Sequence, residues 1–267
     1  MSFKIVGTYN GNINDLQFIK NIGYDTVFYT KNNQLTEYAG YLDVPIHYGH
    51  EHPGYLKYII DNYNDLPDRT LFCHCHETSW HQSKPLQNTV NDIKSILFDI
   101  DYLNITDVYP GYNFVIFDEL ESNDSIAVTC DSSNYIETLK KYKLLLNIKT
   151  EDKYYMNRIQ TIHILGKDHC KYYKELFPNT VIPKYLLTKY SPQPVISKDL
   201  LLQKPKIYYE VLYNTLRDIR HNYPDNHHDH CSRYKVSYFW EMMLPYIITS
   251  YNNEIDYYIE KNMEIYI

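Results

Sequence analysis

Long apolar runs, paired cysteines and excess positive charge are all missing from this sequence. No stretch approaches the roughly 18 uninterrupted apolar residues of a membrane-spanning helix, so we expect no membrane span. The 5 cysteines are odd in number and irregularly spaced, which excludes the framework of a disulfide-stapled secreted domain and favours a reducing compartment. The amino terminus has no basic region followed by an apolar run, and we therefore expect a cytoplasmic protein.

The charge balance is acidic. Lys and Arg number 26 against 33 Asp and Glu, which gives a net charge of −7. Proteins that bind the phosphate backbone carry concentrated positive charge, so nucleic acid is not an expected partner.

The order of apolar segments predicts an α/β protein. Residues 3–7 and 25–29 read as buried strands around a short helix at 16–21, and residues 70–75 read as a third strand after a helix that begins near Pro53 and ends near Leu66. Strand, helix, strand is the unit of parallel sheets. We expect one domain over residues 1–267, with a single mostly parallel sheet flanked by helices.

Further elements follow along the chain. We expect a helix over 86–97, a strand over 113–117, a largely helical stretch over 136–164, a helix over 198–220 interrupted at Pro205, and a terminal helix from Tyr238 that bends at Pro245.

A histidine-rich run, TLFCHCHETSWHQ, closes the third strand. Alternate side chains of a strand share a face, so His74 and His76 point one way and Cys73 the other. Two imidazoles at this spacing are able to ligate one ion, with Glu77 or His81 completing the set. The alternative is that these histidines form the hydrogen-bonded end of a buried strand.

Polar residues end all three predicted strands. Thr8, Tyr9 and Asn10 follow the first strand, and Lys31 and Asn32 follow the second. Ligands of open α/β sheets bind beyond the carboxyl ends of the strands, so these ends predict a crevice, with or without metal.

The stretch from His47 to Gln82 resembles the signature of DUF3431, an uncharacterised family of fungi, some bacteria and large DNA viruses. The opening KIVGTYNGNINDLQFI, the segment PQPVISKDLLLQKPKIYYEVLYNTL and the terminal SYFWEMMLPYI are also similar to that family. His47 and His50 depart from it, because the family tends to have Asn and Arg there. The matching residues are Gly49, Glu51, Tyr55, Leu56, Ile59, Ile60, Asn62, Tyr63, Leu66, Pro67, Asp68, Phe72, His74, His76, Trp80 and His81.

This resemblance implies a GT-A-like glycosyltransferase, similar to sugar transferases of large algal viruses, that moves a sugar such as xylose from a UDP-sugar to a glycan or glycoprotein. Residues 1–120 would bind the nucleotide sugar and residues 121–267 the acceptor. In such a fold an Asp-x-Asp after about the fourth strand holds a divalent ion on the donor diphosphate, and His74-x-His76 occupies the matching place. A viral origin would put the protein in the host cytoplasm.

The resemblance also implies roles for single residues. His74, His76 and His81 would stabilise the departing diphosphate directly, which we prefer, or His74 and His76 would hold Mn²⁺ or Mg²⁺. The nucleoside end would be lined by Thr8, Tyr9, Asn10, Lys31 and Asn32, although all five also suit ordinary turns.

An acceptor hydroxyl needs a base, for which Glu77 is the first candidate, Glu241 the second and Asp229 the third. Glu51 is expected to cap the helix that follows it or to brace the site. Trp80 suits packing better than sugar stacking.

Other readings stay open. One is a histidine-ligated metal hydrolase with Glu77 as base, and another is a non-catalytic carbohydrate-binding protein. Asp99-Ile100-Asp101 is a short motif that follows a helix, and the loop HNYPDNHHDH is more typical of a solvated segment than of a metal site.

Overall fold

A computed structural model provides the structure of the chain. It describes residues 1–9, 18, 22–30, 39–41, 51–74, 76–78, 82–96, 98–99, 101–105, 112–120, 126–129, 133–134, 137–138, 159–176, 185–189, 193–222, 240–241, 243–244 and 247–248. The predicted helix over 16–21 lies almost wholly outside these residues.

The chain divides into two compact units. The first comprises Met1–Val108 and Ser191–Leu244, and the second comprises Tyr109–Tyr190 and Pro245–Ile267. The expected single domain, with halves that meet at residue 120, stays a prediction.

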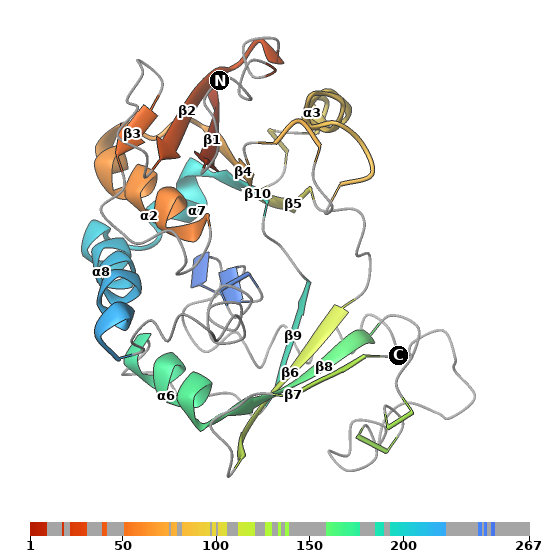
Figure 1. Cartoon of the computed structure of the whole chain (residues 1–267). Coiled ribbons are helices and arrows are strands. Elements are labelled where there is room, and N and C mark those ends of the chain that lie inside the picture. The colour runs from red at the N-terminus through yellow and green to blue at the C-terminus, as the bar shows by residue number, and fades with distance from the viewer. Residues whose placement is uncertain are drawn as a thin grey trace. The chain divides into compact units, whose positions relative to one another are not determined.

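The first unit is built on a six-stranded sheet with the order β3-β2-β1-β4-β10-β5 (Figure 1). β1, β2, β3 and β4 run parallel, and β10 is antiparallel to both of its neighbours. The prediction of a single mostly parallel sheet is therefore wrong, because this sheet is mixed and a second sheet exists. The bounds are β1 Phe3–Tyr9, β2 Asp25–Thr30, β3 Ala39–Tyr41, β4 Arg69–His74, β10 Pro194–Ser197 and β5 Tyr102–Asn104.

The strand order reverses beside β1. The chain moves outward from β1 to β2 and β3, and then returns to the other side of β1 as β4. Thr8 near the end of β1 pairs with His74 at the end of β4, so both lie at the carboxyl edge of this reversal. Such a switch point is where open α/β sheets bind their ligands.

Helix α2, His52–Asp61, connects β3 to β4 and packs against β1. Pro53 suits its first turn, and Tyr55, Leu56 and Ile59 form its buried face. Gly54 is needed for this packing, because a Cβ there would lie 2.0 Å from Oγ1 of Thr8. The short 3₁₀ helix Tyr63–Asp65 follows, and the predicted helix is confirmed.

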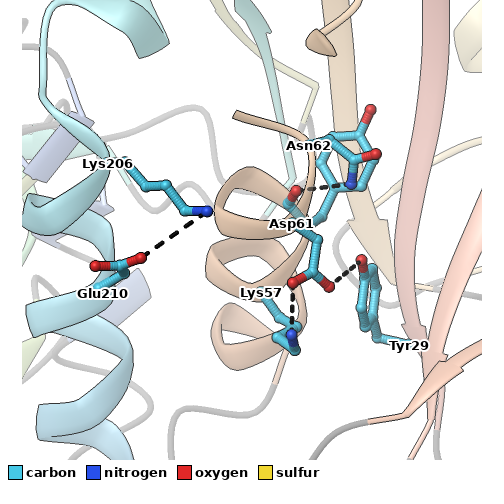
Figure 2. A network of polar contacts seen from close by, with 7 residues as sticks. Tyr29, Lys57, Asp61, Asn62, Lys206 and Glu210 are labelled. Carbon is cyan, nitrogen blue, oxygen red and sulfur yellow. Dashed lines mark hydrogen bonds and ion pairs between the residues drawn. The ribbon is translucent and has the colours of Figure 1, made fainter. Parts of the chain in front are cut away.

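A polar network joins α2 to β2 (Figure 2). The hydroxyl of Tyr29 donates to Asp61 Oδ2 at 3.3 Å, and Lys57 Nζ lies 2.5 Å from Asp61 Oδ1. Burial and the neighbouring Asp61 carboxylate raise the pKa of Tyr29, so its phenol stays protonated and keeps donating. This network holds α2 along the sheet.

Three further helices belong to the first unit: α3 Leu86–Ile93, α7 Lys198–Leu202 and α8 Lys206–Asn222. Ser197 caps α7 by accepting from the backbone N–H of Leu200 at 3.1 Å. The predicted interruption at Pro205 is confirmed, because it separates α7 from α8. α8 packs against α2 (Figure 1).

The second unit has a four-stranded sheet with the order β7-β8-β6-β9. Among its described residues, the long helix is α6, Lys167–Leu176. The strands are β6 Tyr112–Leu120, β7 Ile126–Thr129, β8 Ile159–Gly166 and β9 Tyr185–Lys189. The largely helical reading of 136–164 is wrong at its end, because 159–164 belongs to β8. In a strand, Ile159, Thr161 and His163 share one face, and Ile162 and Ile164 lie on the other. This alternation of β-branched residues suits a strand better than a helix.

His163 shows what a histidine of the core looks like in this protein. It is buried in β8, and burial lowers its pKa to about 4, so its ring is neutral at physiological pH.

Across the part of the chain that the structure describes, no helix combines the length and apolar character that crossing a membrane requires.

Candidate functional site

Five polar residues gather around the carboxyl edge of β1 and β4, and we call them the carboxyl-edge site. They are Thr8, Glu51, His74, His76 and Glu241. All five belong to the first unit.

Glu51 and His74 form the centre of this site. Glu51 Oε1 lies 2.9 Å from His74 Nε2, and the two side chains are only 5 and 16% exposed. Glu51 stands at the N-cap position of α2, but its side chain makes no capping hydrogen bond. Of the two roles expected for Glu51, the contact with His74 matches the brace and not the cap.

Hydrogen bonds also fix the backbones of Glu51 and His74. The hydroxyl of Thr8 donates to the backbone carbonyl of Glu51 at 2.9 Å, which ties the start of α2 to the end of β1. The backbone N–H of His74 donates to Oε1 of Gln193 at 3.1 Å. Gln193 comes just before β10 and was not among the predicted site residues, because nothing local in its sequence marks it.

His76 is the solvent-exposed imidazole of the site. Its ring stacks near that of His74, with centroids 6.4 Å apart and planes at 26°, as expected for side chains two residues apart at a strand end. His76 is exposed, whereas Cys73 is fully buried and burial raises the pKa of its thiol to about 12. Cys73 is therefore an inert core residue.

Glu241 supplies a second buried carboxyl group. Its side chain is 3% exposed, and burial together with the nearby Glu51 carboxylate raises its pKa well above the ordinary value. The neutral form of the Glu241 carboxyl group is therefore favoured more than it is in an exposed glutamate.

The neighbouring Trp240 explains how Glu241 reaches the site. Trp240 is fully buried, and its ring centroid lies 6.0 Å from that of His52, the residue that follows Glu51. His52 is itself fully buried and contacts Tyr55, with centroids 5.6 Å apart. Aromatic packing at the start of α2 therefore brings the segment 240–241 against Glu51.

The remaining predicted residues have other positions. Glu77 is exposed, and its backbone carbonyl accepts from the N–H of Leu86 at 2.8 Å, which closes the segment after His76. Tyr9 ends β1. Asn10, Lys31, Asn32, Trp80, His81 and Asp229 lie outside the described residues.

The Asp99-x-Asp101 motif is at the other edge of the sheet. Asp101 precedes β5, and its Oδ1 lies 3.8 Å from Nη2 of Arg69, the first residue of β4. His74 is the last residue of β4, so Asp101 and the imidazoles are at opposite ends of that strand.

The donor set of the carboxyl-edge site is imidazole and carboxylate. Among the described residues, no three or more His, Cys, Asp or Glu side chains are grouped so that they could hold one metal ion. Cys75 and His81 lie outside the described residues. A ligating imidazole commonly contacts a carboxylate through its other nitrogen, and His74 has such a contact with Glu51.

A family model of a protein of unknown function, DUF3431, matches residues 6–254. The chain belongs to the DUF3431 family. The matched span contains every residue of the carboxyl-edge site, from Thr8 to Glu241. No curated protein and no solved structure matches the chain. Membership in DUF3431 therefore identifies relatives and leaves the activity to be inferred from the site.

Proposed function

We propose that this DUF3431 protein is a glycosyltransferase of GT-A-like architecture that uses a nucleotide-diphosphate sugar. The observation that supports this most is the position of His74, at the carboxyl edge of β4 beside Thr8, where the strand order reverses around β1. Nucleotide ligands bind at such switch points.

The transfer would place negative charge on the diphosphate. The acceptor oxygen bonds to the anomeric carbon of the sugar, while the bond from that carbon to the phosphate oxygen breaks and its electron pair leaves with the diphosphate. His74 and His76 are suited to donate to this growing charge, because their rings lie side by side and His76 is exposed. With Mn²⁺ or Mg²⁺ present, the same two residues would be its ligands.

The proton of the acceptor hydroxyl goes to a carboxylate. Glu77 remains our first candidate, because it is exposed and close in sequence to the two imidazoles. Glu241 suits a supporting role better, since it is buried and its raised pKa favours the neutral form over a proton-accepting carboxylate.

Nucleotide binding tests the proposal. We expect UDP, GDP or ADP, alone or as sugar conjugates, with and without Mn²⁺, to raise the melting temperature by several degrees at 100 times Kd, where a ligand adds about 2.7 kcal/mol. His76→Ala should lower the affinity at least tenfold without loss of folding, because this side chain is exposed. Asn88→Ala, an exposed change on α3, is the matched control. If none of these ligands shifts the melting temperature, the proposal fails.

A second candidate is a metal-dependent hydrolase. The contact between Glu51 and His74 favours it, because it resembles the carboxylate support of metal-ligating histidines. Stoichiometric zinc in the purified protein, and turnover without any nucleotide sugar, would support the hydrolase over the transferase.

A further inference from the structure

The carboxyl end of β4 is held differently on its two sides. On the side of β1, the two strands stay paired as far as Thr8 and His74. On the side of β10, the paired residues of β4 end at Leu71, before His74 is reached. β10 begins with Pro194, which has no backbone N–H to donate. Among the described residues, β10 therefore offers His74 no paired residue.

A side chain supplies the hydrogen bond that the strand does not. Oε1 of Gln193, the residue before β10, accepts from the backbone N–H of His74 at 3.1 Å. Because a backbone N–H only donates, this contact identifies which end of the carboxamide is the oxygen and which is the amino group. Gln193 is 1% exposed, and its Nε2 is buried without a hydrogen-bond partner among the described residues.

Packing alone does not explain a glutamine at this position. A buried amino group without a partner costs folding free energy, and an apolar side chain of similar shape would avoid that cost. What Gln193 adds is an acceptor for the N–H of His74, the last residue of β4. The backbone at this point sets where the imidazole starts, and a displacement of about 1 Å is enough to weaken a binding site.

We propose that Gln193 is a positioning residue of the carboxyl-edge site, which fixes the end of β4 so that the imidazole of His74 is held where a nucleoside diphosphate binds. The inference rests on the proposed function for the identity of the ligand. The group on which Gln193 acts, the backbone N–H of His74, follows from the hydrogen bond alone.

The chain offers a matched control at the opposite end of β10. Oγ of Ser197 accepts from the backbone N–H of Leu200 at 3.1 Å, and both Ser197 and Gln193 are buried. Ser197 pairs with Arg69, the first residue of β4, whereas Gln193 contacts the last. Gln193→Met and Ser197→Ala therefore each remove one buried acceptor from a backbone N–H, but only the first of them acts on His74.

Affinity and stability together separate positioning from simple support of the fold. We expect Gln193→Met and Ser197→Ala to lower the melting temperature by similar amounts, about 2–4 °C. UDP affinity, with GDP and ADP measured in parallel, should fall about tenfold or more in Gln193→Met and stay within about twofold of the parent chain in Ser197→Ala. Gln193→Asn, which withdraws the acceptor by one methylene, provides the same test if Gln193→Met does not fold.

Nuclear magnetic resonance with labelled histidine detects the position of His74 without any ligand. Gln193→Met should shift the backbone amide signal of His74, because a hydrogen bond is lost, and should also shift the signals of its imidazole ring. Ser197→Ala should leave both unchanged. A purely structural Gln193 would shift the amide signal and leave the ring signals in place.

Failure of this inference is distinct from failure of the proposed function. If UDP, GDP or ADP binds the parent chain and binds Gln193→Met equally well, the inference is overturned. Equal losses of affinity in Gln193→Met and Ser197→Ala, or unshifted ring signals of His74, overturn it as well. If none of these nucleotides binds the parent chain, the proposed function fails, while the ring signals still test the role of Gln193.

Discussion

The two edges of the six-stranded sheet carry charge in different ways. At the amino edge, Asp68 accepts from the backbone N–H of Ser2 at 2.6 Å, and Asp101, 73% exposed, pairs with Arg69. At the carboxyl edge, Glu51 and Glu241 are buried near each other, and Glu51 lies 2.9 Å from His74. Surface pairs contribute little to stability, whereas buried charges are costly unless partnered. The carboxyl edge therefore buries ionisable groups at a cost in folding free energy that the fold alone does not require, as is typical of a functional site.

The largest expected difference between the edges comes from removing one partner of each ion pair. His74→Ala removes the imidazole that lies 2.9 Å from the buried Glu51 carboxyl group and leaves a cavity beside it, which should lower the free energy of unfolding by about 3 kcal/mol. Asp101→Ala, which removes the exposed partner of Arg69, should cost less than about 1 kcal/mol. Urea unfolding of both variants measures the contrast, and equal losses would contradict it.

Glycine substitutions give a somewhat smaller contrast. Gly54→Ala places a Cβ against Thr8 and should cost about 1–3 kcal/mol, whereas Gly23→Ala meets open space but must adopt a φ of 74°, which costs about 1 kcal/mol. Thr8→Ala should partly rescue Gly54→Ala and leave Gly23→Ala unimproved. A double-mutant cycle on chemical unfolding checks this, and additive losses at positions 8 and 54 would refute the proposed clash.

At the carboxyl edge, the free energy of unfolding should fall as pH rises. Because the pKa of Glu241 is raised in the folded state, the folded chain holds a proton that the unfolded chain releases above its ordinary pKa. The parent chain should therefore lose stability as pH rises from about 4.5 toward the raised value. Glu241→Gln should match the parent at the acid end and exceed it increasingly at neutral pH, as measured by unfolding at a series of pH values. No gain at neutral pH would show that Glu241 is ionised in the folded chain.

At the amino edge the pH dependence should have the opposite sign and the smallest amplitude. The hydrogen bond from the Ser2 N–H lowers the pKa of Asp68, so its contribution is present above the ordinary value of 3.8 and is lost as pH falls below it. Asp68→Asn should lower stability slightly at neutral pH and match the parent in acid. The same titration series detects this, and a loss that persists in acid would mean that the charge of Asp68 is not responsible.

Local patterns in the sequence were enough to predict the elements that support the site. The apolar run 3–7, the spacing of Tyr55, Leu56 and Ile59, and the polar end of β4 each follow from short-range periodicity, and all correspond to observed elements. The position of His74 at the carboxyl edge followed from the same patterns.

Contacts between distant segments were not predictable in this way. β10 is four residues long and begins with Pro194, and its antiparallel pairing with β4 has no local signature. Glu51 was expected to cap α2 or to brace the site because only its place before a helix was visible, and its contact with a residue 23 positions later depends on the crossover between β3 and β4. Glu241 was the second candidate for a base, and its burial beside Glu51 depends on the packing of Trp240 against His52.

The wide separation of the paired segments also bears on the order of events during synthesis. β5 joins the six-stranded sheet through β10, which emerges from the ribosome about ninety residues after β5, and Glu241 follows later still. A nascent chain that ends before residue 194 therefore exposes one side of β4, where chaperones or a neighbouring nascent chain could pair with it. Slow closure of these long-range contacts would make the site one of the last parts of the molecule to become competent.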